Sequence, residues 1–204
     1  MSDIERIDAK QVKELRDKTG AGMMDCKRAL EGAEGDTEKA VRILREKGLA
    51  RVKQRDERET EQGIIEAYLH IGRQIGALVE LNCETDFVAR NDEFLELAHL
   101  VALQIAACNP LYQDRESVPG DVVDSKKEIY RELCVADGKP EKEHDSIIDE
   151  MLEKYYQEVC LLEQPFVKDP SESVGELLTQ TSAKVGEKLA IRRFSRFQVG
   201  EKQE

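Results

Sequence analysis

A strand pattern gives way to a helix pattern within the segment Glu80-Leu81-Asn82-Cys83-Glu84-Thr85-Asp86-Phe87-Val88-Ala89-Arg90-Asn91. Before it, apolar residues alternate with polar or small ones, which predicts a half-buried strand. After it, apolar residues recur at helical spacing, and Asn91 is suited to cap that helix. The alternating residues are Ile75, Ala77, Val79 and Leu81, and the helical ones are Phe94, Leu97, Val101, Ile105 and Cys108. We therefore expect a strand-to-helix corner at Phe87.

The residues of this corner allow two interpretations. The ring of a phenylalanine in a loop can pack into the core of its own chain, which is the commoner case, or it can contact a partner. Both interpretations remain open for Phe87. Glu84 and Asp86 could supply paired carboxylates to an enzyme, but charged side chains beside a turn are usually just solvated. An enzyme is therefore the weaker hypothesis.

The composition is that of a folded, soluble protein. The 204 residues suffice for one or two domains, with 40% hydrophobic and 36% charged residues. No apolar run approaches the thickness of a bilayer, and the first residues lack a signal region, so a cytoplasmic protein without a membrane partner is expected. Five scattered cysteines and three scattered histidines suit a reducing compartment, so we predict no disulfide, metal or cofactor site.

The net charge of −12 argues against nucleic acid as a direct partner, because binding to phosphates requires a basic face. A local basic spot near the C-terminus is formed by Arg192, Arg193 and Arg196. On an alternating strand, these three are more simply a solvated face.

The first fifty residues predict a bundle of three short helices. Asp8 with Gln11 is a capping box for the first helix, Asp36 caps the third, and Gly48 is expected to end it. So small a bundle has a limited core and is predicted to be a docking unit on a charged linker. We predict one domain of residues 1–54 and a second of residues 55–204.

The second domain predicts an α+β core. Strand-like residues 63–71 and 74–82 are joined by Gly72-Arg73, which is a hairpin signal. Later helices are expected at 125–136, 146–162 and 174–185, with a loop between Pro165 and Pro170. Residues 188–199 predict a last strand that pairs with the hairpin. The fold class is therefore α+β, with a three-helix bundle and a three-stranded antiparallel sheet packed by helices.

Two long motifs of the chain are similar to motifs of one known family. They are Leu15-Arg16-Asp17-Lys18-Thr19-Gly20-Ala21-Gly22-Met23-Met24-Asp25-Cys26-Lys27-Arg28-Ala29-Leu30 and the segment from Glu80 to Arg90. Both resemble bacterial translation elongation factor Ts, and the segment from Gly186 to Glu201 is similar to that family's closing strand. The motifs occur in the family's order and span nearly the whole chain.

The resemblance implies a guanine nucleotide exchange factor that does no chemistry of its own. Its partner would be elongation factor Tu, the GTPase that carries aminoacyl-tRNA, in the GDP-bound and nucleotide-free forms. The N-terminal module resembles a ubiquitin-associated (UBA) bundle that docks on the GTPase through Arg16, Met23, Met24 and Lys27. From the residues alone, the two methionines could equally pack on their own third helix.

The resemblance also implies a wedge that dislodges the magnesium ion beside the nucleotide pocket, so that GDP leaves. The wedge residues would be Thr85, Asp86, Phe87 and Val88. Asp86 would either repel the acidic ligands around the magnesium ion or bond to the partner's backbone, and the sequence leaves both open.

The short segment before Pro165 resembles the compact form of the family, in which two chains pair their sheets into a homodimer. The alternative function is a UBA-like adaptor without exchange activity.

Overall fold

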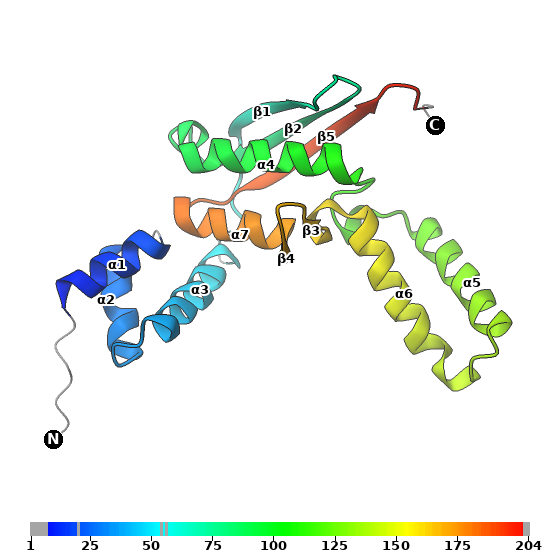
Figure 1. Ribbon diagram of the computed structural model, residues 1–204, viewed down its shortest axis with the longest axis horizontal. Coiled ribbons are helices and arrows are strands. Elements are labelled where there is room, and N and C mark those ends of the chain that lie inside the picture. The colour runs from blue at the N-terminus through cyan, green and yellow to red at the C-terminus, as the bar shows by residue number, and fades with distance from the viewer. Residues whose placement is uncertain (1–7, 20, 54, 56, 202–204) are drawn as a thin grey trace. The chain divides into compact units, whose positions relative to one another are not determined.

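The computed structural model describes residues 8–19, 21–53, 55 and 57–201 of the chain (Figure 1). The elements follow in the order α1 (Ala9–Thr19), α2 (Met23–Gly32), α3 (Thr37–Lys53), β1 (Gln62–Leu69), β2 (Ile75–Cys83), η1 (Val88–Arg90), α4 (Asp92–Cys108), η2 (Arg115–Ser117), α5 (Gly120–Ala136), η3 (Glu141–Glu143), α6 (His144–Val159), η4 (Leu161–Glu163), β3 (Pro165–Phe166), β4 (Asp169–Ser173), α7 (Val174–Val185) and β5 (Ala190–Gln198). This order confirms the predicted α+β class.

The described residues form two compact units. The first takes residues from the segments 1–63, 82–94 and 178–190, and the second takes residues from 64–81, 95–177 and 191–204. The first unit therefore joins the N-terminal helices to the corner around Phe87. The predicted domain boundary after residue 54 stays a prediction.

Helices α1, α2 and α3 enclose a small apolar core in the first unit. The amide of Asp8 donates to Gln11 Oε1 (3.2 Å), as expected of a capping box. The amides of Glu38 and Lys39 donate to Asp36 Oδ1 (2.9 and 3.0 Å). The buried residues are Val12, Leu15, Cys26, Ala29, Leu30, Ala33, Ala40 and Leu44. The predicted three-helix bundle is confirmed.

Helix α3 does not end at Gly48, as the sequence predicted, but continues to Lys53. A glycine inside a helix costs about 1 kcal/mol relative to alanine, which is why it predicted an end. Here it makes room for a neighbour, because a Cβ added at Gly48 would lie 3.2 Å from Cβ of Ala183 in α7. Close approach of two helices explains the glycine, and no turn is needed.

The three main strands lie in the order β1-β2-β5, so the last strand pairs with the hairpin as predicted. The hairpin turns at Gly72 and Arg73, whose φ angles of 90° and 57° are those of a tight turn. Helix α4 packs on one face of the sheet: His99 contacts Glu66 of β1 (3.1 Å), and Arg196 of β5 donates to Ala106 O (3.2 Å). One face of the sheet is thereby covered.

The opposite face of the sheet in the second unit carries exposed apolar side chains. Burial alternates along β2, where Ala77, Val79 and Leu81 are buried and Leu78 between them is 45% exposed. The exposed apolar residues of this face are Ile65, Leu69, Leu78, Phe197 and Val199. A hollow of about 350 Å³ is lined in part by four of them, Leu69, Leu78, Phe197 and Val199.

Helices α5 and α6 form an antiparallel pair in the second unit (Figure 1). Helix α5 starts at Gly120, five residues before the predicted start, because Pro119 precedes the first turn and accepts from the amides of Val122 and Val123. Both valines join the small apolar cluster around Tyr155. Hydrophobic packing thus extends the helix beyond its predicted N-terminus.

The predicted loop between Pro165 and Pro170 is wrong, because β3 and β4 form a two-stranded antiparallel sheet there. The fully buried Gln104 of α4 organises this segment. Its side-chain Nε2 donates to Pro165 O (3.2 Å), and its Oε1 accepts from the amide of Val167 (2.8 Å). A contact from a distant helix, invisible to local patterns, holds these strands.

Candidate partner-binding site

The corner between β2 and α4 places buried residues behind an exposed ring. Val88 and Ala89 in η1 are 8% and 9% exposed, whereas Phe87 directly before them is 85% exposed. The turn is closed by the amide of Asn91, which donates to Val88 O (2.9 Å). Of the two interpretations of Phe87, the structure therefore favours the one in which the ring is offered outward.

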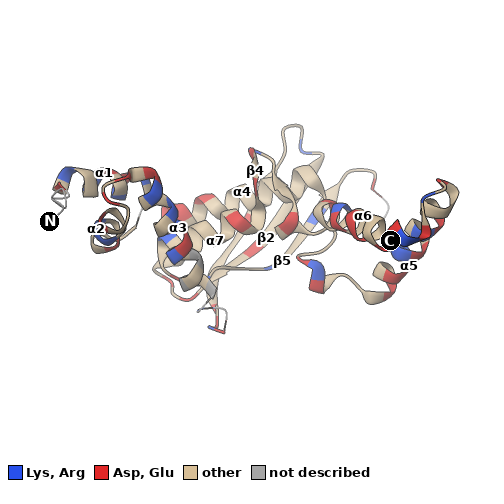
Figure 2. Ribbon diagram, turned by 90° about the horizontal axis from the view of Figure 1, so that it is seen from below, with Lys and Arg blue, Asp and Glu red and all other residues tan. Residues whose placement is uncertain are grey.

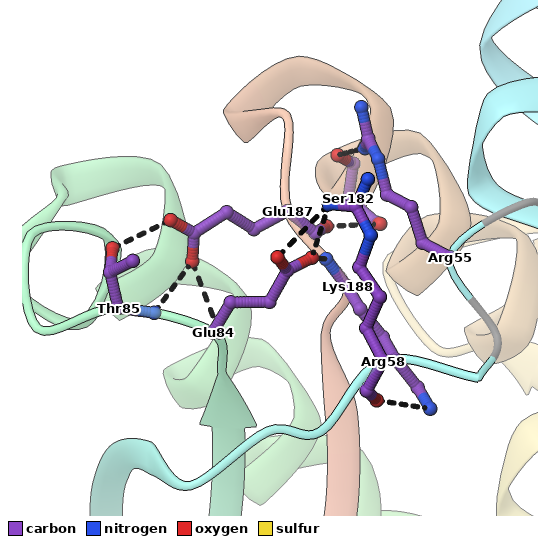
Figure 3. Close-up of polar contacts among 7 residues, drawn as sticks. All are labelled: Arg55, Arg58, Glu84, Thr85, Ser182, Glu187 and Lys188. Atoms are coloured by element: carbon purple, nitrogen blue, oxygen red, sulfur yellow. Dashed lines mark hydrogen bonds and ion pairs between the residues drawn. The ribbon is translucent and has the colours of Figure 1, made fainter.

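The rear of the corner is held by a carboxylate from the segment between α7 and β5 (Figure 3). Glu187 accepts hydrogen bonds from the amides of Glu84 (3.1 Å) and Thr85 (2.9 Å) and from the Thr85 hydroxyl (2.6 Å). The Ser182 hydroxyl in turn donates to the carbonyl oxygen of Glu187 (2.5 Å). The backbone that leads into the corner is thus tied to the end of α7.

Glu84 makes the reciprocal connection in Figure 3. Its carboxylate accepts from the amide of Lys188 (2.6 Å) and from the guanidinium of Arg58 (3.0 Å). Burial by itself would raise the pKa of Glu84, but the Lys188 amide and the Arg58 charge outweigh it and hold the pKa below its ordinary value. The carboxylate is therefore ionised at neutral pH, which keeps these bonds charge-assisted.

Cys83 adds a third tie to the corner. Its buried thiol donates to the carbonyl oxygen of Thr85 (3.1 Å). Burial, followed by the negative charge of Glu187, raises the pKa of Cys83 to about 11. The thiol therefore stays protonated at neutral pH and remains a hydrogen-bond donor.

The two carboxylates considered for enzyme chemistry are each neutralised by a different cation. Glu84 pairs with Arg58, and Asp86, which is 56% exposed at its side chain, pairs with Arg90 (3.1 Å). A carboxyl group that acts as a general acid near neutral pH needs a raised pKa, so that it still holds its proton. The lowered pKa of Glu84 does not fit that role.

The N-terminal residues named by the family resemblance all lie on the surface of the bundle. Met23 and Met24 begin α2 and are 45% and 61% exposed, so packing on their own third helix is not favoured. Lys27 on the same helix is exposed and pairs with Glu31 (3.8 Å), and Arg16 of α1 is exposed as well. The first unit thus carries a mixed apolar and basic surface on its bundle.

The basic residues near the C-terminus do not form a uniform solvated face, which corrects the sequence-based expectation for Arg196. Its side chain is only 10% exposed because it folds onto α4, whereas Arg193 is 79% exposed and pairs with Glu80 (2.7 Å). Arg192 is exposed. Figure 2 shows acidic and basic residues interspersed along α5 and α6, a mixture typical of solvated helices.

Sequence reasoning missed Glu187, Arg58 and Ser182 as parts of the site. A signal existed, because the last strand was predicted to return to the hairpin. Antiparallel pairing of β5 with β2 brings the residues just before β5 next to those just after β2. That step would have placed Glu187 beside Glu84.

No three His, Cys, Asp or Glu side chains among residues 8–19, 21–53, 55 and 57–201 are grouped so that they could hold a metal ion. Within the same residues, no helix combines the length and apolarity that crossing a bilayer requires.

Comparison with known proteins finds a matching family. The family described as Elongation factor TS matches residues 9–201. The protein named Elongation factor Ts from Carboxydothermus hydrogenoformans is 53% identical over 195 residues, which are 96% of this chain and 90% of that protein. Those from Desulfosudis oleivorans and Thermodesulfovibrio yellowstonii are each 51% identical, over 96% and 97% of this chain and 98% of each relative. The similarity extends over both compact units.

Proposed function

Since this chain belongs to the elongation factor Ts family, we propose that it releases GDP from elongation factor Tu by inserting the corner of residues 85–88 beside the pocket for nucleotide and magnesium. The observation that carries this proposal is the 85% exposed ring of Phe87 on a corner whose backbone is bonded from behind. Val88, which is buried, would support the ring from within, while Thr85 and Asp86 flank it.

The exchange reaction demands more binding energy than this ring can supply. Lowering nucleotide affinity by ~10⁴-fold requires about 5.5 kcal/mol of differential binding, and the coupling is reciprocal. One buried aromatic anchor contributes about 2 to 4 kcal/mol. A second docking surface is therefore needed. We assign it to the exposed surface of the bundle, with Arg16, Met23, Met24 and Lys27, because exposed flexible methionines suit binding to a partner.

The experiment that tests the proposal follows release of fluorescent GDP from elongation factor Tu by stopped flow, with magnesium present. Increasing amounts of the full chain should raise the release rate to a plateau that lies on the order of 10⁴-fold above the spontaneous rate. A release rate independent of the chain would contradict the proposal. If the chain then bound another protein through its bundle, the UBA-like adaptor would be the better interpretation.

We also propose that two chains form a homodimer through the uncovered face of the sheet in the second unit. Contiguous exposed apolar side chains on a soluble protein commonly mark an interface. The supporting observation is the set of exposed side chains around Leu78 and Phe197, with a hollow between them. A second copy fits this face because an identical apolar face would cover its exposed side chains, and the charges at its margin, Glu80 and Arg193, already pair with each other (2.7 Å).

Leu78→Arg is expected to convert this dimer to a monomer, because it places an unpaired cation in the apolar contact. Sedimentation equilibrium should give twice the chain mass for the wild type and the single chain mass for the variant. Leu111→Arg changes a leucine that is 61% exposed elsewhere and should stay dimeric. A monomeric wild type at micromolar concentration would refute the proposed dimer.

A further inference from the structure

A ring on an exposed corner can push on a partner only if the backbone beneath it resists being pushed back. In a loosely held loop, binding energy would be spent on ordering the loop. Phe87 is 85% exposed, so its own side chain gains little support from packing. The stiffness of the corner therefore comes from the buried Val88 and Ala89 behind the ring and from bonds to the backbone that leads into it.

Those bonds converge on Glu187 (Figure 3). Its carboxylate accepts three hydrogen bonds from Glu84 and Thr85, at 3.1, 2.9 and 2.6 Å. Bonds from backbone amides to an ionised carboxylate are among the strongest in proteins, and here they hold two consecutive peptide groups just before the ring. The direction in which the chain enters the corner is thereby set.

The position of Glu187 is itself secured. Its carbonyl oxygen accepts from the Ser182 hydroxyl of α7, and the next residue, Lys188, donates its amide to the Glu84 carboxylate. Each carboxylate thus accepts hydrogen bonds from the backbone of the other segment: Glu187 from the corner, and Glu84 from the segment just before β5. Such a closed set of bonds cannot be displaced without breaking several of them together.

We propose that Glu187 is a positioning residue for nucleotide exchange, which holds the backbone at Glu84 and Thr85 so that the ring of Phe87 transmits force to the partner. This inference rests on the function proposed above. Glu187 acts through the corner and contacts neither nucleotide nor metal.

Glu187→Gln tests this role, because the amide keeps the shape but loses the charge and one acceptor oxygen. We expect the maximal rate of stimulated GDP release to fall about ten-fold, as the loss of charge-assisted bonds implies. The concentration for half-maximal release should change less than about two-fold, since the docking surface on the bundle is untouched. Circular dichroism should show an unchanged fold.

Glu153→Gln is the matched control. Glu153 is likewise a carboxylate that accepts hydrogen bonds, in its case from the guanidinium of Arg115 (2.6 Å), but it lies on α6 in the second unit. The same chemical change there should leave GDP release unchanged. Should Glu187→Gln fail to fold, Ser182→Ala removes the bond that holds the Glu187 carbonyl and should lower the maximal rate in the same direction by a smaller factor.

A double-mutant cycle with Phe87→Ala separates positioning from a merely structural role. If Glu187 acts through the ring, Glu187→Gln should cause no further loss of rate in the Phe87→Ala background. An unchanged rate for the single Glu187→Gln variant, or a full additional loss in the double variant, would overturn the inference. A silent Phe87→Ala variant would instead overturn the proposed function on which it rests.

Discussion

Replacing Phe87 by alanine is expected to lower the maximal rate of stimulated GDP release by about 30-fold or more, because a buried aromatic anchor is worth about 2 to 4 kcal/mol. The fold should survive the change. The ring is 85% exposed in the free chain, and the residues that pack beneath the corner, Val88 and Ala89, remain. The free energy of unfolding measured in urea should therefore change by less than about 0.5 kcal/mol.

The measurement is stopped-flow release of fluorescent GDP from elongation factor Tu at saturating concentrations of the chain. Leu111→Ala is the matched control, since it also truncates a large side chain that is 61% exposed and should leave the rate unchanged. If Phe87→Ala released GDP as fast as the wild type, the corner would not be the wedge.

Removal of residues 1–53 is expected to weaken binding to elongation factor Tu by roughly 100-fold, equivalent to about 3 kcal/mol, the scale of one or two anchor residues. The cut respects the observed end of α3 at Lys53. It also keeps Arg55 and Arg58, which donate to Ser182 O (3.4 Å) and to Glu84 (3.0 Å). The maximal rate at saturation should fall as well, because the docking surface supplies part of the differential binding that displaces the nucleotide.

Half-saturating concentrations from the same release assay check this expectation. The bundle has its own apolar cluster, so circular dichroism should lose only the signal of α1 to α3. Global loss of structure would reject the picture of a separate docking module. In the full chain, Met23→Ser combined with Met24→Ser should weaken binding by about ten-fold and lower the maximal rate less than the deletion does.

The elements of the fold were largely predictable because their signals are local. The capping residues Asp8, Asp36 and Asn91 act within three residues of their own positions, and all three make the expected hydrogen bonds. The errors arose where a distant contact outweighed a local signal. Gly48 stays inside a helix beside Ala183, and Gln104 organises strands β3 and β4 from another element.

The sequence predicted where the candidate site lies along the chain, but it did not predict all the residues that build the site. The change of period at the corner placed Phe87 between two elements, yet the burial of its ring depends on what packs there in three dimensions. The bonds to Glu187 span about a hundred positions of sequence, and no local pattern reports a partner at that separation.

By itself, the sequence determined the α+β class, the caps and periods of most elements, and the family, since these follow from residue types at short spacing and from long ordered motifs. Only the tertiary structure decided that Phe87 points outward while Val88 is buried, that Glu84 and Glu187 hold the corner from behind, and that one face of the sheet stays open. The physical reason is that the burial of a side chain and the partner of a hydrogen bond both depend on a second segment of the chain. Such pairs of segments exist only once the chain has folded and brought them within a few ångströms.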